Sequence, residues 1–375
     1  MLSSIPKIFI SNGHIFRIIF TIIVCFWLFS YLTASLSFLT SINYFLSLFL
    51  MMYLIVSSQI HRFRFSFLII IYSFLILITF IISRFYYLTP SFSALTIILN
   101  IWLGVGLYIY GAYFNILKFL HITFCLYVLT NILVLDIAPS SVMLNSYNHL
   151  SIVSIGLLAL SNFSFQQNQK RFFLFQIFLT FLVCVFSIGR SGILSSFTLL
   201  ILVNTYFLHK SDLRTSYKRF IFLFFLLFLF ISVVLFLNSD LAIRFIASSM
   251  DLSGREEIFS RYFSSLGLIE FFIGHDINFT RANIDPKLSI HNSYLGMHQG
   301  AGIFGLILAI FTLFILPFLM KQNFILFSLY LTIILRALTD NILYTNGFIY
   351  GTVATAFILY TISNIKVYFS ILPKK

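Results

Sequence analysis

Long apolar runs, separated by short polar breaks, constrain the fold of this chain more than any other feature. Each run approaches the roughly 20 residues that an α-helix needs to cross a bilayer. Only 9% of the 375 residues are charged, whereas a soluble domain carries roughly 25%. The pattern predicts an all-α polytopic membrane protein with about twelve transmembrane helices, at 15–37, 41–57, 65–83, 92–110, 116–135, 149–162, 172–188, 192–208, 219–238, 301–320, 323–339 and 347–364.

One long polar interval divides these spans into two groups. Residues 1–238 hold the first nine predicted helices, residues 239–300 form the interval, and residues 301–375 hold the last three helices and the C-terminus. A connection of this length is usually functional or disordered. Because it contains apolar stretches of its own, we expect a partly helical loop.

The loop sequence GREEIFSRYFSSLGLIEFF, at 254–272, has apolar residues at helical spacing. Ser253 and Glu256 fit a capping box, which places Arg255 at the start of the helix. A helix start also favours anions, because the dipole is positive there. We expect this helix to lie in the membrane interface with its aromatic face in lipid or against the bundle.

The basic residues sort unequally between the two sides of the predicted bundle. With the N-terminus inside, fifteen lysines and arginines fall on the inner side and eight on the outer side. This bias follows the positive-inside rule and predicts that both termini are cytoplasmic. The net charge of +13 is therefore a topological signal, and nucleic acid is not needed to explain it.

The charged residues predicted for the outer side differ in kind from those inside. Seven of the eight outer basic residues are arginines, and nine of the ten acidic residues share that side. Arginine presents a planar fork that suits phosphate and carboxylate groups. The outer face therefore resembles a site for a charged substrate. Salt bridging within the loop is the alternative explanation.

Arg190, in VFSIGRSGILSSF, is the most informative single residue. An arginine at the edge of a span needs a partner or a water-filled cavity, and Gly189 and Gly192 would let backbone or ligand approach closely. Anion binding competes here with a snorkelling arginine. Arg84 and Arg336 are further edge arginines, for which snorkelling is a simpler explanation. Asp340 lies one turn after Arg336, which predicts a local ion pair.

Motifs of several enzyme classes are absent from the sequence. It contains no HExxH, GxSxG, P-loop or GxGxxG pattern and no acidic spacing suited to a metal. The three cysteines, Cys25, Cys125 and Cys184, lie inside apolar runs and are expected to be small buried hydrophobes. No metal or other cofactor is therefore predicted.

Four outer motifs follow one another in the sequence: IGRSGILSSF at 188–197, SGREEIFSRYFSSL at 253–266, FFIGHD at 271–276 and IHNSYLGMHQGAGIFGLI at 290–307. This ordered set resembles the O-antigen polymerase (Wzy) and O-antigen ligase superfamily. The resemblance covers mainly residues 185–310. The short HNSYL form and the Phe-rich character resemble a polymerase more than a ligase.

The resemblance implies glycosyl transfer at the periplasmic face of the bacterial inner membrane. The donor in this family is a glycan on undecaprenyl pyrophosphate, and the acceptor is a sugar hydroxyl of a second lipid-linked repeat unit or, for a ligase, of the lipid A core. Neither metal nor nucleotide takes part. By position, Arg190, Arg255 and His291 match the catalytic residues of the family. A chain-length regulator and a flippase are implied as possible partners, beside membrane lipid.

The residue types suit this chemistry in their own right. Two arginines can neutralise a pyrophosphate leaving group without metal, and His291 can act as the general base for an acceptor hydroxyl. Single displacement then predicts inversion at the anomeric carbon. The expected substrate-binding residues are Asn292, Tyr294, Arg261, Arg281, Arg336 and His298.

Three alternatives stay open at this point. A ligase would transfer the glycan to lipid A core. A lipid-linked oligosaccharide flippase would carry charged residues along a central cavity. A sensor or scaffold would tolerate loss of Arg190, Arg255 and His291 in a complementation test.

Overall fold

The computed structural model is almost entirely helical over the residues that it describes. The described residues are 8–32, 37–57, 65–87, 93–111, 115–142, 147–163, 170–187, 189–211, 260, 262–274, 292–340, 342–344 and 348–371. No strand occurs in these ranges. The helices are α1 (Ile8–Leu32), α2 (Ser37–Val56), α4 (Ser66–Tyr87), α5 (Ser93–Tyr110), α6 (Asn115–Leu133), α7 (Pro139–Val142), α8 (Tyr147–Ser161), α9 (Lys170–Phe186), α10 (Arg190–His209), α14 (Leu268–Ile273), α16 (Ser293–Phe314), α17 (Leu316–Gln322), α18 (Phe324–Thr339) and α19 (Phe348–Ile371).

The all-helical prediction is confirmed for this part of the chain, and several helices are able to cross a membrane. Four are long and apolar enough: Ser66–Tyr86, Asn115–Leu133, Arg190–His209 and Ser293–Gln322. Shorter apolar helices accompany them. Eleven of the twelve predicted spans overlap a helix, and the remaining one, 219–238, lies outside the described residues. The total of twelve spans and the outer location of the loop stay predictions.

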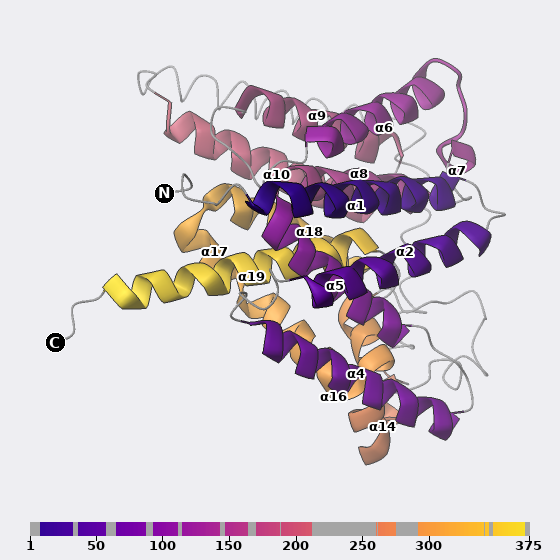
Figure 1. Cartoon of the computed structure of the whole chain (residues 1–375). Coiled ribbons are helices and arrows are strands. Elements are labelled where there is room, and N and C mark those ends of the chain that lie inside the picture. Colours follow the sequence, from indigo (N-terminus) through magenta and orange to yellow (C-terminus); the bar gives the residue numbers. More distant parts are fainter. Residues whose placement is uncertain are drawn as a thin grey trace.

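The long helices lie side by side in a bundle, with α7 and α14 toward one end and α17 toward the other (Figure 1). Helices α5 and α19 form the most extensive pair. A Cβ atom on Gly104 of α5 would lie only 2.5 Å from the Cβ of Thr355 on α19. Small residues of this kind allow close helix packing in membranes, where apolar side chains gain little by leaving lipid.

Two large aromatic side chains in the centre of the bundle form hydrogen bonds between helices. The hydroxyl of Tyr330 donates to the carbonyl of Thr312 at 2.8 Å, and the hydroxyl of Tyr350 donates to the carbonyl of Ile152 at 2.9 Å. A buried hydroxyl without such a partner would be costly in an apolar setting. These bonds tie α18 to α16 and α19 to α8.

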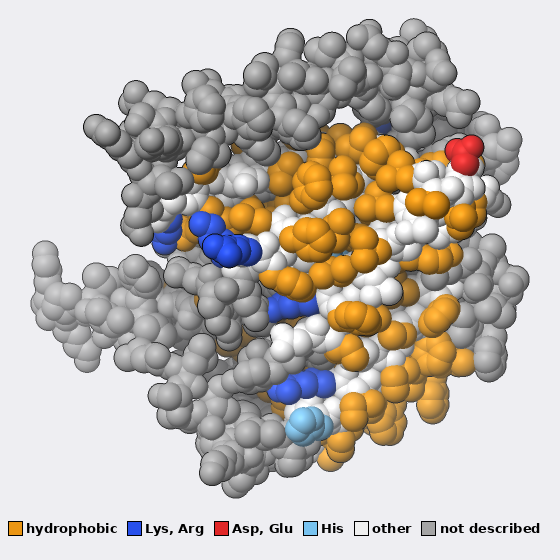
Figure 2. Space-filling model, turned by 90° about the horizontal axis from the view of Figure 1, so that it is seen from above, with side chains coloured by type: hydrophobic (Ala, Val, Ile, Leu, Met, Phe, Trp, Pro, Cys, Tyr) orange, Lys and Arg blue, Asp and Glu red, His pale blue; other side chains and the backbone are white. Residues whose placement is uncertain are grey.

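Charged side chains on the face drawn in Figure 2 are unevenly distributed. Most of the visible Lys and Arg side chains lie in the half nearer the end at which α1 begins, and the visible acidic side chain lies at the opposite end. Much of the surface between them is apolar, as expected for helices that face lipid. The sorting of charge between the two sides of a membrane stays a prediction.

Two segments differ in detail from the sequence expectation. Helix α16 begins at Ser293, earlier than the predicted start at 301, and its backbone is non-helical at Ala301 and Gly302. The predicted loop helix through 254–272 is interrupted, because Gly267 is extended (φ −84°, ψ 177°) and a new helix, α14, starts after it. Glycine weakens a helix interior, so apolar spacing alone did not reveal this break.

Candidate functional site

Four helix ends meet at one place in the bundle: the starts of α8, α10 and α16 and the end of α18. We call the side chains that join them the Arg336 cluster, which consists of Asn148, Ser151, Ser191, Ser293, Arg336 and Asp340. The three helix starts each place the positive end of a dipole near the cluster. Two of them, those of α10 and α16, carry motifs that the sequence analysis singled out.

Arg336 lies at the centre of the cluster and is fully buried. Its Nη1 lies 2.7 Å from Oδ2 of Asp340, and its Nη2 donates to the carbonyl of Asn148 and to Oγ of Ser151, each at 3.2 Å. Its Nε and Nη1 have no partner with hydrogen-bond geometry among the described residues. The predicted ion pair with Asp340 is confirmed. The snorkelling alternative for Arg336 is wrong, because the side chain turns into the protein.

Asp340 and Ser293 extend the cluster to two more helices. Oδ2 of Asp340 accepts from Oγ of Ser191 on α10 at 3.4 Å, and its carbonyl accepts from Oγ of Ser293 on α16 at 2.5 Å. The Ser293 hydroxyl in turn accepts from the backbone N–H groups of Ile342 and Leu343, at 2.8 and 2.9 Å. Hydrogen bonds therefore fix the start of α16 to the segment that follows α18.

The start of α10 packs directly on α8. A Cβ atom added at Gly189 would lie 2.7 Å from Oγ of Ser151. A Cβ atom added at Gly192 would lie 2.4 Å from the Cβ of Ser151. The predicted close approach at these two glycines is confirmed, and the group that approaches them is the Ser151 side chain of α8. Arg190 is the first residue of α10 and is half-buried, between Gly189 and Ser191, which both contact the cluster. Gly189 gives the first turn no side-chain cap.

Asn292 and Tyr294 were predicted to hold sugar hydroxyls. The Asn292 side chain caps α16, since its Oδ1 accepts from the N–H groups of Tyr294 and Leu295 at 2.9 and 3.3 Å. Its Nδ2 donates to the carbonyl of Leu338 at 3.4 Å. Asn292 therefore stabilises the start of α16, and asparagine is one of the residues favoured at the N-cap position. The buried Tyr294 hydroxyl has no hydrogen-bond partner within the described ranges.

His298 lies further along α16 and contacts the loop segment 262–274. Its Nε2 lies 3.0 Å from the carbonyl of Phe271, and its Nδ1 lies 2.5 Å from the hydroxyl of Tyr262. A carbonyl only accepts, so Nε2 carries the proton, and the Tyr262 hydroxyl donates to Nδ1 of the neutral ring. Both side chains are buried. We call this pair the His298 latch.

Backbone contacts hold the same loop segment against the kink of α16. Gly274 has φ +90°, and a Cβ there would lie 2.5 Å from the carbonyl oxygen of Gln299. Gly302 has φ +53°, and a Cβ there would meet the carbonyl oxygen of Phe272. Only glycine combines these conformations with so little space. Gly274 and Gly302 therefore let the two backbones pack closely.

The structure brings three of the predicted site residues to the Arg336 cluster: the backbone of Arg190, the capping residue Asn292 and Arg336 itself. His298 belongs instead to the latch. Arg84 is exposed in the last turn of α4. Tyr294 lies in the first turn of α16, directly after the cluster member Ser293. The other four predicted residues, His291, Arg255, Arg261 and Arg281, lie outside the described residues.

Several residues in or beside the cluster did not emerge from the sequence. His149, at the start of α8, lies where the charges of both Asp340 and Arg336 act on its imidazole. Asn148 and Ser151 belong to the same helix start. The signal that could have found them is the polar run NSYNHLS at 145–151, directly before a predicted span on the outer side. Polar residues at a span edge are common, so this signal is weak alone.

The described residues contain no group of three or more His, Cys, Asp or Glu side chains placed to hold a metal ion. Comparison of the chain with protein-family models, with curated proteins and with solved structures gave no match.

Proposed function

We propose that this chain is an O-antigen polymerase. In this proposal it joins oligosaccharide repeat units carried on undecaprenyl pyrophosphate, at the periplasmic face of the bacterial inner membrane, and releases undecaprenyl pyrophosphate. The observation that carries the proposal is the start of α10. There the predicted catalytic Arg190 stands at a helix N-terminus whose Gly189 supplies no side-chain cap, and a buried polar network holds that helix start in place.

Charge balance separates the tasks of the two arginines. Arg336 is buried against Asp340, which offsets its charge, so Arg336 adds little net attraction for an anion. Arg190 is half-buried, and the first-turn amide groups of α10 lie at the positive end of the helix dipole. We assign pyrophosphate binding to Arg190 and the positioning of α10 to Arg336 and Asp340, acting through Ser191.

The reaction needs two things of the chain: stabilisation of the leaving pyrophosphate and a general base. An acceptor sugar oxygen forms a bond to the anomeric carbon of the donor, and the bond from that carbon to the pyrophosphate oxygen breaks. Arg190 and Arg255 stabilise the charge left on the pyrophosphate. His291 takes the proton of the acceptor hydroxyl as general base. The exchange is a single displacement with inversion, and no metal takes part.

A strain that lacks the chain tests the proposal. Lipopolysaccharide from a polymerase mutant should run on a gel as core plus one repeat unit, because single units are still ligated. Bare core would instead indicate a ligase or a flippase. A flippase mutant would also give bare core, and only the purified ligase would then transfer glycan to lipid A core in vitro. An unchanged ladder would exclude all three functions.

The proposed membrane arrangement has its own test. Both termini and the lysine-rich helix ends should face the cytoplasm, while the Arg336 cluster and residues 239–300 should face the periplasm. Single cysteines at Ser211 and Ser264 can be probed in intact cells with a thiol reagent that does not cross the membrane. Labelling at 264 and protection at 211 are expected, and the opposite pattern would reverse the topology.

A further inference from the structure

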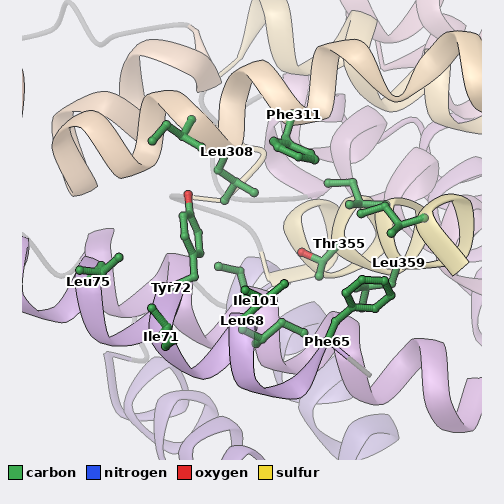
Figure 3. Close-up of a pocket in the computed structure, with 14 residues that line it drawn as sticks. Phe65, Leu68, Ile71, Tyr72, Leu75, Ile101, Leu308, Phe311, Thr355 and Leu359 are labelled. Carbon is green, nitrogen blue, oxygen red and sulfur yellow. The ribbon is translucent and has the colours of Figure 1, made fainter. Parts of the chain in front are cut away.

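A trough of about 380 Å³ lies between α4, α5, α16 and α19. Its walls are Phe65, Leu68, Ile69, Ile71, Tyr72, Leu75, Ile101, Ile307, Leu308, Phe311, Thr355, Ile358, Leu359 and Ile362. Figure 3 shows α4 along one side and α16 along the other, with Leu308 and Phe311 directed into the space between them. None of these residues belongs to the Arg336 cluster or to the His298 latch.

The lining offers no free polar group to a ligand. Tyr72 points from α4 toward α16 (Figure 3), where its hydroxyl donates to the carbonyl of Phe304. The hydroxyl of Thr355 is paired with that of Tyr344 at 2.8 Å. Every other lining side chain is a hydrocarbon. An occupant of this trough must therefore be apolar along its whole length.

The trough is long and runs parallel to the helix axes. Its lining on α4 recurs at helical spacing from Phe65 to Leu75, and on α19 from Thr355 to Ile362. At 1.5 Å per residue, the α4 wall is roughly 15 Å long. That length matches about half of the roughly 30 Å hydrocarbon core of a bilayer, which is the depth of one leaflet. The dimensions suit one extended chain that stands upright in the membrane.

Two of the helices that form the trough are candidate membrane spans. Both α4 and α16 are long and apolar enough to span a membrane, and only 11% of the most apolar stretch of α4 is buried inside the protein, less than in the other three candidate spans. Water does not enter such a space, and an empty trough would leave its lining without van der Waals contacts on one side. A hydrocarbon chain from the adjoining leaflet restores those contacts.

We propose that the trough binds one acyl chain of a bilayer phospholipid, from the leaflet that meets the N-terminal end of α4. The trough lies apart from the Arg336 cluster. Its α16 wall, Ile307–Phe311, lies beyond the kink at Ala301 and Gly302, whereas the Arg336 cluster lies at the start of that helix. This inference does not depend on the proposed function.

Photo-crosslinking in vesicles tests the proposal. The purified full chain is placed in phosphatidylcholine and phosphatidylglycerol vesicles with a trace of phosphatidylcholine carrying a diazirine within one acyl chain, and labelled residues are mapped by mass spectrometry. Labelling per residue at Phe65–Leu75 and Thr355–Ile362 should exceed that at Phe119 and Phe172 several-fold. The last two side chains are also exposed and apolar but lie outside the trough, on α6 and α9. Equal labelling at all four places would overturn the proposal.

A substitution at the rim of the trough supplies the second arm. Ile307→Trp adds bulk at a partly exposed position. Labelling of the trough residues should then fall to the level seen at Phe119 and Phe172. Leu126→Trp, at a similarly exposed site on α6, should leave the excess unchanged. Persistence of the excess in Ile307→Trp would contradict the assignment. Polyprenyl phosphate and unlabelled phospholipid can also be added as competitors in equal amounts. If only polyprenyl phosphate abolishes labelling of the trough, the occupant is a polyprenyl chain and the proposal is wrong.

Discussion

Nη1 of Arg336 lies 2.7 Å from Oδ2 of Asp340, with the arginine fully buried. The pair stands where the starts of α8, α10 and α16 meet the end of α18. Its partners Asn148, Ser191 and Ser293 come from the other three helices. Hydrogen bonds of Arg336 and Asp340 therefore reach the starts of three other helices, among them the helix that begins with Arg190.

Breaking this ion pair should destabilise the protein strongly. Removing one partner leaves an uncompensated buried charge, which costs roughly 3–5 kcal/mol, so Arg336→Met and Asp340→Leu should each lower the thermal unfolding midpoint in detergent. The double variant Arg336→Met/Asp340→Leu should recover much of that loss, because no lone charge remains. Equal midpoints for all three variants and the wild type would show that the pair carries no stability.

Arg190 should matter for catalysis far more than for folding. Arg190→Ala should lower the rate of polymer formation from lipid-linked repeat units by about 10²–10³-fold, the typical effect of losing one donor to a developing oxyanion. The rate of Arg190→Lys should lie between those of the wild type and Arg190→Ala, since lysine keeps the charge without the planar fork. Arg84→Ala, at an exposed outer-edge arginine of α4, is the matched control and should polymerise normally. Wild-type rates for Arg190→Ala would remove it from the site.

The contact of α10 with Ser151 should not tolerate a methyl group. Gly192→Ala would place a Cβ 2.4 Å from the Ser151 Cβ, and overpacking of this kind costs about 1–3 kcal/mol. Ser151→Gly in the same chain should restore part of the stability by removing the clashing atoms. Gly13→Ala serves as control, since its nearest contact would be an ordinary 3.5 Å. A thermal midpoint unchanged by Gly192→Ala would mean that the two helices can separate without cost.

The His298 latch should hold the loop segment against α16. His298→Ala removes both hydrogen bonds of the imidazole, each worth about 1 kcal/mol and more where a buried partner is left unsatisfied. The backbone N–H groups of 262–274 should then exchange hydrogen several-fold faster in mass spectrometry. Tyr262→Phe should have a smaller effect, and Gln299→Ala, beside the latch in sequence, should have none. Unchanged exchange in His298→Ala would contradict the latch.

Elements that depend on local sequence were predictable. Apolar runs of membrane-spanning length appear as helices at eleven of the twelve predicted positions, since helix hydrogen bonds are made within each segment and lipid tolerates little else. The Arg336–Asp340 pair was predictable for the same reason, because its partners lie one helical turn apart. The interruption at Gly267 was missed because apolar spacing continues across it.

The site itself depended on distant contacts. Arg336 and Asn148 are 188 positions apart in the chain, and Tyr262 and His298 are 36 apart, so no periodicity joins them. His298 was expected to bind substrate, whereas in the structure Phe271 and Tyr262 occupy both of its ring nitrogens. The amino-acid sequence by itself determined that this is a helical membrane protein with arginines at its span edges. Only the tertiary structure decided which of those arginines is buried as a support and which helix start it supports, because burial depends on neighbours from other helices.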